Sequence, residues 1–243
     1  MGIFQVIEWN DNSKNTIVYR VDLSKEKNTL NKGSVLTVRD SQAAIFSDKG
    51  KMYDVFLPGT YKLDTSTLPL ISKLLAWKTG FEVPFKSDVY FVNTKNFVDN
   101  KWGTQNPIMV RDPEYGAVRI RGFGTYSFKI DDPYVFMCEI SGTCSSYKTE
   151  EIVDYLRSKI VTNITDAIGE SGLSCIDMAA NVIEFGDIVK KNLNVKLKEF
   201  GIVLTDFNFE NFSLPENLQK ILDDEMELRM KGRNIDAYSR VAQ

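Results

Sequence analysis

The spacing of apolar residues changes near residue 131, and this change limits the chain to a fold that combines sheet with helix. Between Ala117 and Ile130 apolar and polar residues alternate, as along a strand with one buried face. After Asp131-Asp132-Pro133, which predicts a short helix, apolar residues recur about every four positions. The alternating positions are Val118, Ile120, Tyr126, Phe128 and Ile130, and the helical series is Ile152, Leu156, Ile160, Ile164 and Ile168. We therefore expect an α+β fold.

The residues before this change predict a bent, mostly antiparallel sheet with short helices. The predicted strands are Thr16–Val21, the β-branched stretch Ser34–Phe46, Met52–Leu57 and Val89–Val92. Pro58-Gly59 predicts a turn after the third of these. Thr67 is placed to cap a short helix that has Pro69 in its first turn and ends at Gly80.

The motif Gly122-Phe123-Gly124 lies inside the predicted strand and is not interpreted as a phosphate-binding loop. Ser127 occupies the position of a third glycine, and no helix follows the motif. We interpret these glycines as a bulge or a point of close packing.

The residues after 131 predict two packed amphipathic helices and a further strand. The second helix is expected from Cys175 to Phe200, with Gly201 at the C-terminal cap position. Its apolar stripe is Met178, Val182, Phe185, Val189, Leu193 and Leu197. In the strand Ile202–Phe212 the predicted apolar face is Val203, Thr205, Phe207 and Phe209. We expect both helices to pack on the sheet, because their polar faces carry charges of both signs.

Ser213-Leu214-Pro215-Glu216 has the form of a capping box and predicts a last, charged helix that runs to the end of the chain. This helix has few apolar residues, and its acidic and basic residues are spaced for i,i+4 ion pairs. One copy cannot bury its sparse apolar stripe alone, so we expect neighbouring copies or partners to cover it. The predicted oligomer or partner residues are Leu218, Ile221, Leu222, Leu228 and Ile235. The pattern stops without an end signal, and we expect the natural chain to continue after Gln243.

Composition argues against several classes of function. The chain has 30 basic and 33 acidic residues and a net charge of -3, so no overall field attracts it to nucleic acid. It has no histidine, the commonest metal ligand and proton-transfer group near neutral pH. Cys138, Cys144 and Cys175 are odd in number and lack CxxC spacing, which favours a reducing, cytoplasmic setting without a zinc site. We therefore expect no cofactor and no metal, although composition does not exclude chemistry by carboxylates or thiols.

We expect neither a signal peptide nor a transmembrane segment. The N-terminal residues lack a basic leader, and no stretch approaches the ~18 uninterrupted apolar residues that a spanning helix needs. Contact with a membrane is therefore expected to be superficial or to occur through a partner.

Two alternative functions stay open. An enzyme could use paired carboxylates, and the candidates are Asp54, Asp112, Glu114, Asp131 and Asp132. In that case Arg111, Arg119 and Arg121 are candidates to hold an anion. A ligand- or nucleic-acid-binding module could instead stack bases on strand aromatics beside these arginines. Its candidate aromatics are Tyr90, Phe91, Trp102, Phe123 and Tyr126.

The order and spacing of several motifs resemble the SPFH or band 7 family, which includes stomatin, prohibitin and flotillin. The motifs are Ser41-Gln42-Ala43-Ala44-Ile45-Phe46, Leu57-Pro58-Gly59, Ile130-Asp131-Asp132-Pro133, Phe200-Gly201-Ile202 and Leu214-Pro215-Glu216. Within the family, Tyr90-Phe91-Val92-Asn93 and Lys101-Trp102-Gly103-Thr104 are similar to a bacterial soluble subgroup described as virion-core-like. Longer members of that subgroup carry a zinc ribbon after the helix.

The resemblance implies a non-enzymatic scaffold that forms homo-oligomers and recruits membrane-associated partner proteins. Similar soluble members belong to envelope-stress responses of the phage-shock type. It implies a location at the inner face of the cell membrane through such partners, because the sequence does not show the hydrophobic anchor of stomatins. We divide the chain into an N-terminal strand segment (1–30), an SPFH domain (31–212, with subdomains of about 31–135 and 136–212) and a charged, coiled-coil-like helix (213–243).

Overall fold

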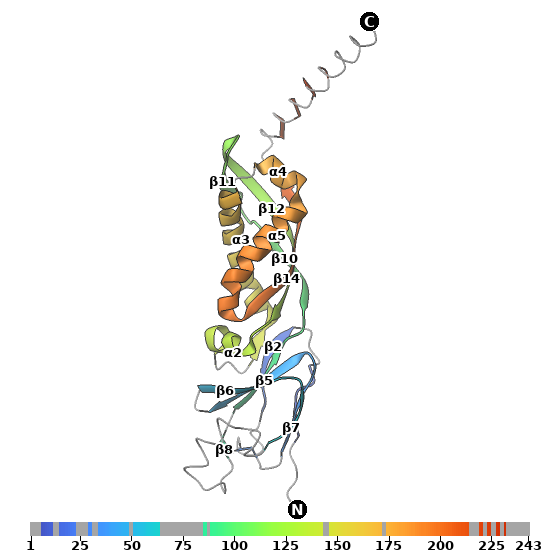
Figure 1. Ribbon diagram of the computed structural model, residues 1–243, viewed down its shortest axis with the longest axis vertical. Helices are drawn as coiled ribbons and strands as arrows, with labels where there is room; N and C mark the ends of the chain where they lie inside the picture. Colours follow the sequence, from blue (N-terminus) through green and yellow to red (C-terminus); the bar gives the residue numbers. More distant parts are fainter. Residues whose placement is uncertain are drawn as a thin grey trace, which may run out of the picture. The chain divides into compact units, whose positions relative to one another are not determined.

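The structure is a computed structural model, and it describes residues 6–11, 15–22, 29–30, 34–48, 51–63, 85–86, 88–142, 146–171, 174–213, 219–220, 223–224, 227–228 and 231 (Figure 1). The strands are β1 (Val6–Glu8), β2 (Thr16–Arg20), β3 (Thr29–Leu30), β4 (Val35–Val38), β5 (Gln42–Asp48), β6 (Lys51–Phe56), β7 (Gly59–Lys62), β8 (Phe85–Lys86), β9 (Asp88–Asn93), β10 (Phe97–Gly103), β11 (Ile108–Asp112), β12 (Gly116–Ile130), β13 (Ser146–Lys148) and β14 (Ile202–Ser213). The helices are α2 (Pro133–Phe136), continued by a π-helical turn (Met137–Ser141), α3 (Thr149–Ser171), α4 (Cys175–Ala180) and α5 (Val182–Leu197), continued by a 3₁₀ turn (Lys198–Phe200).

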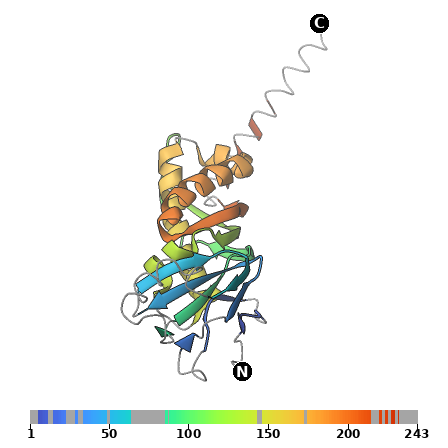
Figure 2. The same cartoon turned by 60° about the horizontal axis from the view of Figure 1, so that its bottom comes forward.

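The expected α+β class with mostly antiparallel sheets is confirmed. A five-stranded sheet has the order β13-β2-β9-β5-β6. In a second sheet β12 lies between β10 and β11, and β14 also pairs with β12. A three-stranded sheet has the order β1-β4-β7, in which β1 and β4 are parallel. Figure 2 shows the five-stranded sheet from the side of the N-terminal strands, with β5 and β6 in blue.

The chain forms two compact units that interleave along the sequence. The first unit contains Met1–Asn100, Tyr126–Lys159 and Lys190–Asp206. The second contains Lys101–Thr125, Ile160–Val189 and Phe207–Gln243.

The core of the first unit lies between the three-stranded and the five-stranded sheet. Side chains of β1 and β4 on one side pack against side chains of β5, β6 and β9 on the other. The buried cluster is Ile7, Trp9, Leu36, Val38, Ala44, Phe46, Phe56, Leu63, Val89 and Phe91. Aromatic rings of this cluster meet edge to face, as Phe46 and Phe56 do with centroids 5.2 Å apart. Strand β4 alternates between half-buried and buried residues, as expected for a strand with one buried face, whereas every residue from Val89 to Asn93 in β9 is buried, so this central strand is covered on both faces.

Strand β12 confirms the alternation that the sequence predicted. Val118, Ile120, Tyr126, Phe128 and Ile130 are all buried. The glycines on the same face lie in the second unit, where β14 passes closely: a Cβ atom at Gly124 would overlap the backbone oxygen of Asn208. The close-packing interpretation of Gly122-Phe123-Gly124 is therefore correct.

The helix predicted from Cys175 to Phe200 is interrupted at Asn181. This residue has φ -123° and ψ 47°, and its Nδ2 donates to the carbonyl of Asp177 at 3.1 Å. Its own carbonyl accepts from the N–H of Phe185, at the start of α5. Asn181 thus ends one helix and begins the next, as short amide side chains favour. Gly201, with φ 69°, ends the last turn as predicted.

The predicted face of β14 is wrong in its first half. Ile202 and Leu204 are buried, whereas Val203 and Thr205 are half-buried, and the predicted parity returns only at Phe207. The carbonyls of two consecutive residues, Leu204 and Thr205, accept from Asn194 Nδ2 at 3.1 Å and from Lys190 Nζ at 2.7 Å, both on α5. Successive carbonyls of a regular strand point to opposite edges, so β14 is irregular here.

Gly201 also connects three segments of the first unit. Its carbonyl accepts from the N–H groups of Asp131 and Asp132, at 2.9 and 3.1 Å. Asp132 in turn caps α2, because its carboxylate accepts from the N–H of Val135 at 3.0 Å. The end of β12, the start of α2 and the turn into β14 therefore meet at one point.

Two predicted features lie outside the described residues, namely the short helix Thr67–Gly80 and the capping box after Ser213. In the predicted last helix, the described residues 219–220, 223–224, 227–228 and 231 are all helical, which confirms the helix at those positions. The division of the chain at residues 30, 135 and 212 stays a prediction.

We predict that Gly124→Ala lowers the free energy of unfolding by about 1–3 kcal/mol, because the added methyl group overlaps the β14 backbone. Gly122→Ala is the matched control, since its Cβ would meet the Asn211 oxygen and the Trp102 ring at 3.5 Å, an ordinary contact. Urea denaturation followed by circular dichroism compares the two variants. Equal denaturation midpoints for the two variants would show that the β14 backbone leaves room for a side chain at position 124.

Candidate functional site

Of the five residues predicted to mediate oligomer or partner contacts, the structure describes Leu228. Its side chain is 68% exposed, and every described residue between 219 and 231 is exposed as well. Glu227 and Lys231 form the predicted i,i+4 ion pair. Leu218, Ile221, Leu222 and Ile235 lie outside the described residues.

The aromatic platform suggested by the sequence does not form. Tyr90, Phe91, Trp102 and Tyr126 are buried, and only Phe123 of the five is exposed. The Trp102 ring stacks on Phe207 at 5.2 Å, and its Nε1 donates to the carbonyl of Asn208 at 3.2 Å. These rings build the core instead of offering surfaces on which bases could stack.

Most of the candidate carboxylates have structural partners. Asp132 caps α2, and Asp131 forms an exposed ion pair with Lys129 at 3.1 Å. Glu114 is exposed in the turn between β11 and β12. The side chain of Asp54 lies outside the described part of the chain.

Asp112 holds the β11–β12 turn against the start of α4. It is 3% exposed, and its Oδ1 accepts from the N–H groups of Glu114 and Tyr115 at 2.8 and 2.9 Å. Its Oδ2 accepts from the N–H of Cys175 at 2.6 Å. Burial alone would raise the pKa of Asp112, but these backbone donors outweigh it and hold the pKa below its usual value. The carboxylate is thus ionised and structural.

The thiols differ in environment. Burial, together with the neighbouring Asp112 carboxylate, raises the pKa of Cys175 to about 12, so this thiol stays protonated and unreactive at neutral pH. Cys138 is an exposed free thiol, and Cys144 lies outside the described residues.

The arginines proposed as anion ligands do come together, on the exposed face of the β11–β12 hairpin. The register places Arg111 opposite Ala117 and Met109 opposite Arg119, while Arg121 and Phe123 follow along the same face of β12. Met109 is 60% exposed and Phe123 49% exposed. We call these residues the hairpin face: Met109, Arg111, Arg119, Arg121 and Phe123.

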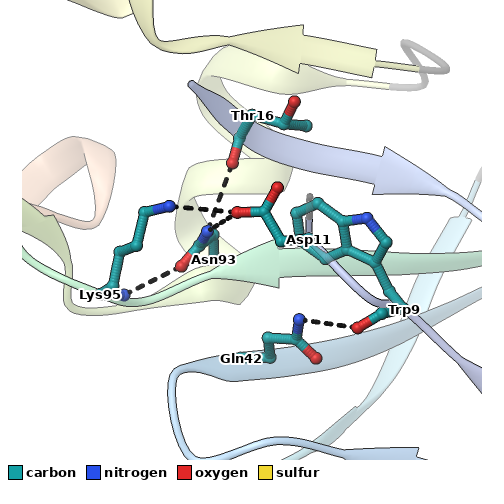
Figure 3. A network of polar contacts seen from close by, with 6 residues as sticks. All are labelled: Trp9, Asp11, Thr16, Gln42, Asn93 and Lys95. Carbon is teal, nitrogen blue, oxygen red and sulfur yellow. Dashed lines mark hydrogen bonds and ion pairs between the residues drawn. The ribbon is translucent and has the colours of Figure 1, made fainter. Parts of the chain in front are cut away.

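A partly buried polar network in the first unit was not anticipated from the sequence (Figure 3). The Nδ2 atom of Asn93, at the end of β9, donates to Asp11 Oδ2 at 2.9 Å and to the carbonyl of Thr16 at 3.4 Å. Lys95 Nζ donates to the same Asp11 oxygen at 3.0 Å, and the Lys95 N–H donates to Asn93 Oδ1 at 3.2 Å. We call Asp11, Asn93 and Lys95 the N-terminal clasp, because they hold the segment after β1 against β2 and β9.

Gln42 supports the same segment from the neighbouring strand. It is paired with Asn93 in the register of β5 and β9, and its Nε2 donates to the carbonyl of Trp9 at 3.1 Å. Gln42 and Asn93 both belong to the motifs that carry the family resemblance. The presence of Gln42 and Asn93 in those motifs was the one feature of the sequence that could have pointed to this network, and the network gives both residues a structural role.

No group of three or more Cys, Asp and Glu side chains gathers as a metal-binding set among the residues that the structure describes. Within the same residues, none of the helices combines the length and the apolar character needed to cross a membrane.

Comparison with known proteins identifies relatives of the whole chain. The family model described as "SPFH domain-Band 7 family" matches residues 18–230. A protein of Bacillus subtilis, "Uncharacterized protein YdjI", is 27% identical over 239 residues, which are 98% of this chain and 72% of that protein.

For the N-terminal clasp, we predict that Asn93→Ala lowers the free energy of unfolding by about 2 kcal/mol. The substitution leaves Asp11 and the Thr16 carbonyl without their buried donor. Lys95→Gln is the control and should cost less than about 1 kcal/mol, because its ion pair is partly solvated. Equal losses in urea denaturation would contradict the central role of Asn93.

Asp112 should make stability depend on pH. Because its pKa in the folded protein lies below the usual 3.8, its contribution is present above that pH and is lost as the pH falls through the folded value. The free energy of unfolding should therefore decline more steeply below about pH 4 for the unmodified protein than for Asp112→Asn. Denaturation at a series of pH values tests this, and parallel curves would refute it.

Proposed function

Because the chain belongs to the SPFH domain/band 7 family, whose members are generally membrane-associated scaffold proteins, we propose that it is a non-enzymatic scaffold that self-associates and recruits partner proteins. Copies would associate through the helix after Ser213 and so present several binding surfaces side by side. The partners would be membrane-associated proteins, for which the phage-shock type of envelope-stress response is the candidate. They would hold the assembly at the inner face of the cell membrane.

The exposure of the helix around Leu228 is the observation that carries this proposal. All its described residues are exposed, and six of the seven are polar or charged. A polar helix gains little stability by itself, because most helical stability in proteins comes from packing of an apolar face. In the sequence, Leu228 belongs to a series with Ile221 and Ile235 at seven-residue intervals, a spacing typical of apolar residues that share one face of an associating helix. Another copy of the chain could cover that face.

The carboxylates support a scaffold over an enzyme. Asp112, Asp131 and Asp132 have partners within the fold, as described above, and the low pKa of Asp112 makes it a poor proton donor at neutral pH. General acid chemistry would require the opposite pKa shift.

We predict that the triple variant Ile221→Ser, Leu228→Ser and Ile235→Ser lowers the molar mass of the assembly and the recovery of partners. Light scattering after gel filtration, over a concentration series, measures the first effect. Pull-down from membrane and soluble fractions measures the second.

The matched control is Gln219→Ser, Asp223→Ser and Lys231→Ser, which changes exposed polar positions of the same helix and leaves the net charge unaltered. It should assemble as the unmodified protein does. If the unmodified protein is a monomer at every concentration, or if both triple variants assemble equally, the self-association is wrong.

A further inference from the structure

The hairpin face combines cations with apolar side chains on one side of two adjacent strands. Arg111, Arg119 and Arg121 are exposed, as are Met109 and Phe123. The antiparallel register sets Met109 directly opposite Arg119, and side chains two residues apart along β12 lie on the same face. The five side chains therefore form one continuous patch.

The arginines of this patch are free to meet an external anion. None of the three forms an ion pair with a carboxylate of the described residues. Lys101, on the neighbouring strand β10, is also exposed and adds a cation to this part of the second unit. Exposed carboxylates of the same unit are Glu114, in the turn between β11 and β12, and Glu210 on β14. The patch remains cationic after both are counted.

These side chains are not among the buried residues of the second unit. The opposite face of the hairpin supplies its buried residues, Val110, Val118 and Ile120. Because side chains alternate between the faces, the register that buries these three also exposes the arginines and Phe123. Large exposed apolar side chains grouped beside cations are typical of a surface that contacts another molecule.

We propose that the hairpin face binds directly to the surface of an anionic lipid bilayer. Arginines attract anionic headgroups, while Phe123 and Met109 can enter the boundary between headgroups and acyl chains. Single-stranded nucleic acid fits less well, because it requires several stacking surfaces and Phe123 is the only exposed ring of the candidate set. The five side chains lie on one face of two adjacent strands, an arrangement that can meet the surface of a bilayer with cations and apolar groups together.

This inference deepens the proposed function, on which it rests, by adding lipid contact to attachment through partners. Self-association would strengthen it, since several weakly binding patches on one assembly act together.

The test uses the full chain and vesicles of phosphatidylcholine with or without phosphatidylglycerol. The variant Arg119→Glu with Arg121→Glu reverses the charge of the patch. Lys191→Glu with Lys198→Glu is the matched control, because it changes exposed cations of the other unit and alters the net charge by the same amount. We expect sedimentation with anionic vesicles only, lost at high salt. The arginine variant should bind at least about 10-fold more weakly than the control.

A third variant, Phe123→Trp, should show a blue-shifted emission difference on adding anionic vesicles, which reports entry of the ring into the interface. Absence of vesicle binding at low salt, or equal binding by the two charge variants, would overturn the proposal. The proposal would also be overturned if the hairpin face bound an acidic protein but did not bind vesicles. Gel filtration of the same proteins distinguishes failure of the lipid contact from failure of the proposed self-association. If the protein assembles but does not bind vesicles, only the lipid contact is refuted. If it is a monomer that still binds vesicles, only the self-association is refuted.

Discussion

The arrangement of the first unit depends on the close approach of two backbones at Gly201. Its φ of 69° is unfavourable for residues with a side chain, and a Cβ atom there would overlap the carbonyl of Asp132. Both constraints require glycine, and the resulting contact lets one carbonyl accept from Asp131 and Asp132. The turn that ends the α5 segment is thereby attached to the end of β12, the strand with which β14 pairs.

The features of the fold that could be predicted from the sequence are those that depend on residues close together in the chain. Alternation gave the faces of β12, and the four-residue series gave the buried stripe of α3, because both depend only on residues close in the chain. The break at Asn181 was missed because the apolar stripe continues through it. The irregularity of β14 could not be seen, because it follows from Lys190 and Asn194 on a different element. The hairpin face likewise required the β11–β12 register.

Several residues of the family motifs have roles within the fold. Gln42, Asn93, Asp132 and Gly201 all make contacts inside the first unit, where they hold segments of the chain together. The family resemblance therefore describes how the chain folds. The residues proposed here for binding, such as Leu228, Arg119 and Phe123, lie instead at exposed positions.

The side chains of α5 along β14 also limit how copies of this protein can join. A strand at the edge of a sheet offers free N–H and C=O groups, and a strand of another molecule can pair with them and extend the sheet without end. Asn194 both donates to and accepts from Leu204, and Lys190 occupies the carbonyl of Thr205, so an incoming strand finds these groups already used. This part of β14 is therefore protected from the edge-to-edge growth that leads to fibrils.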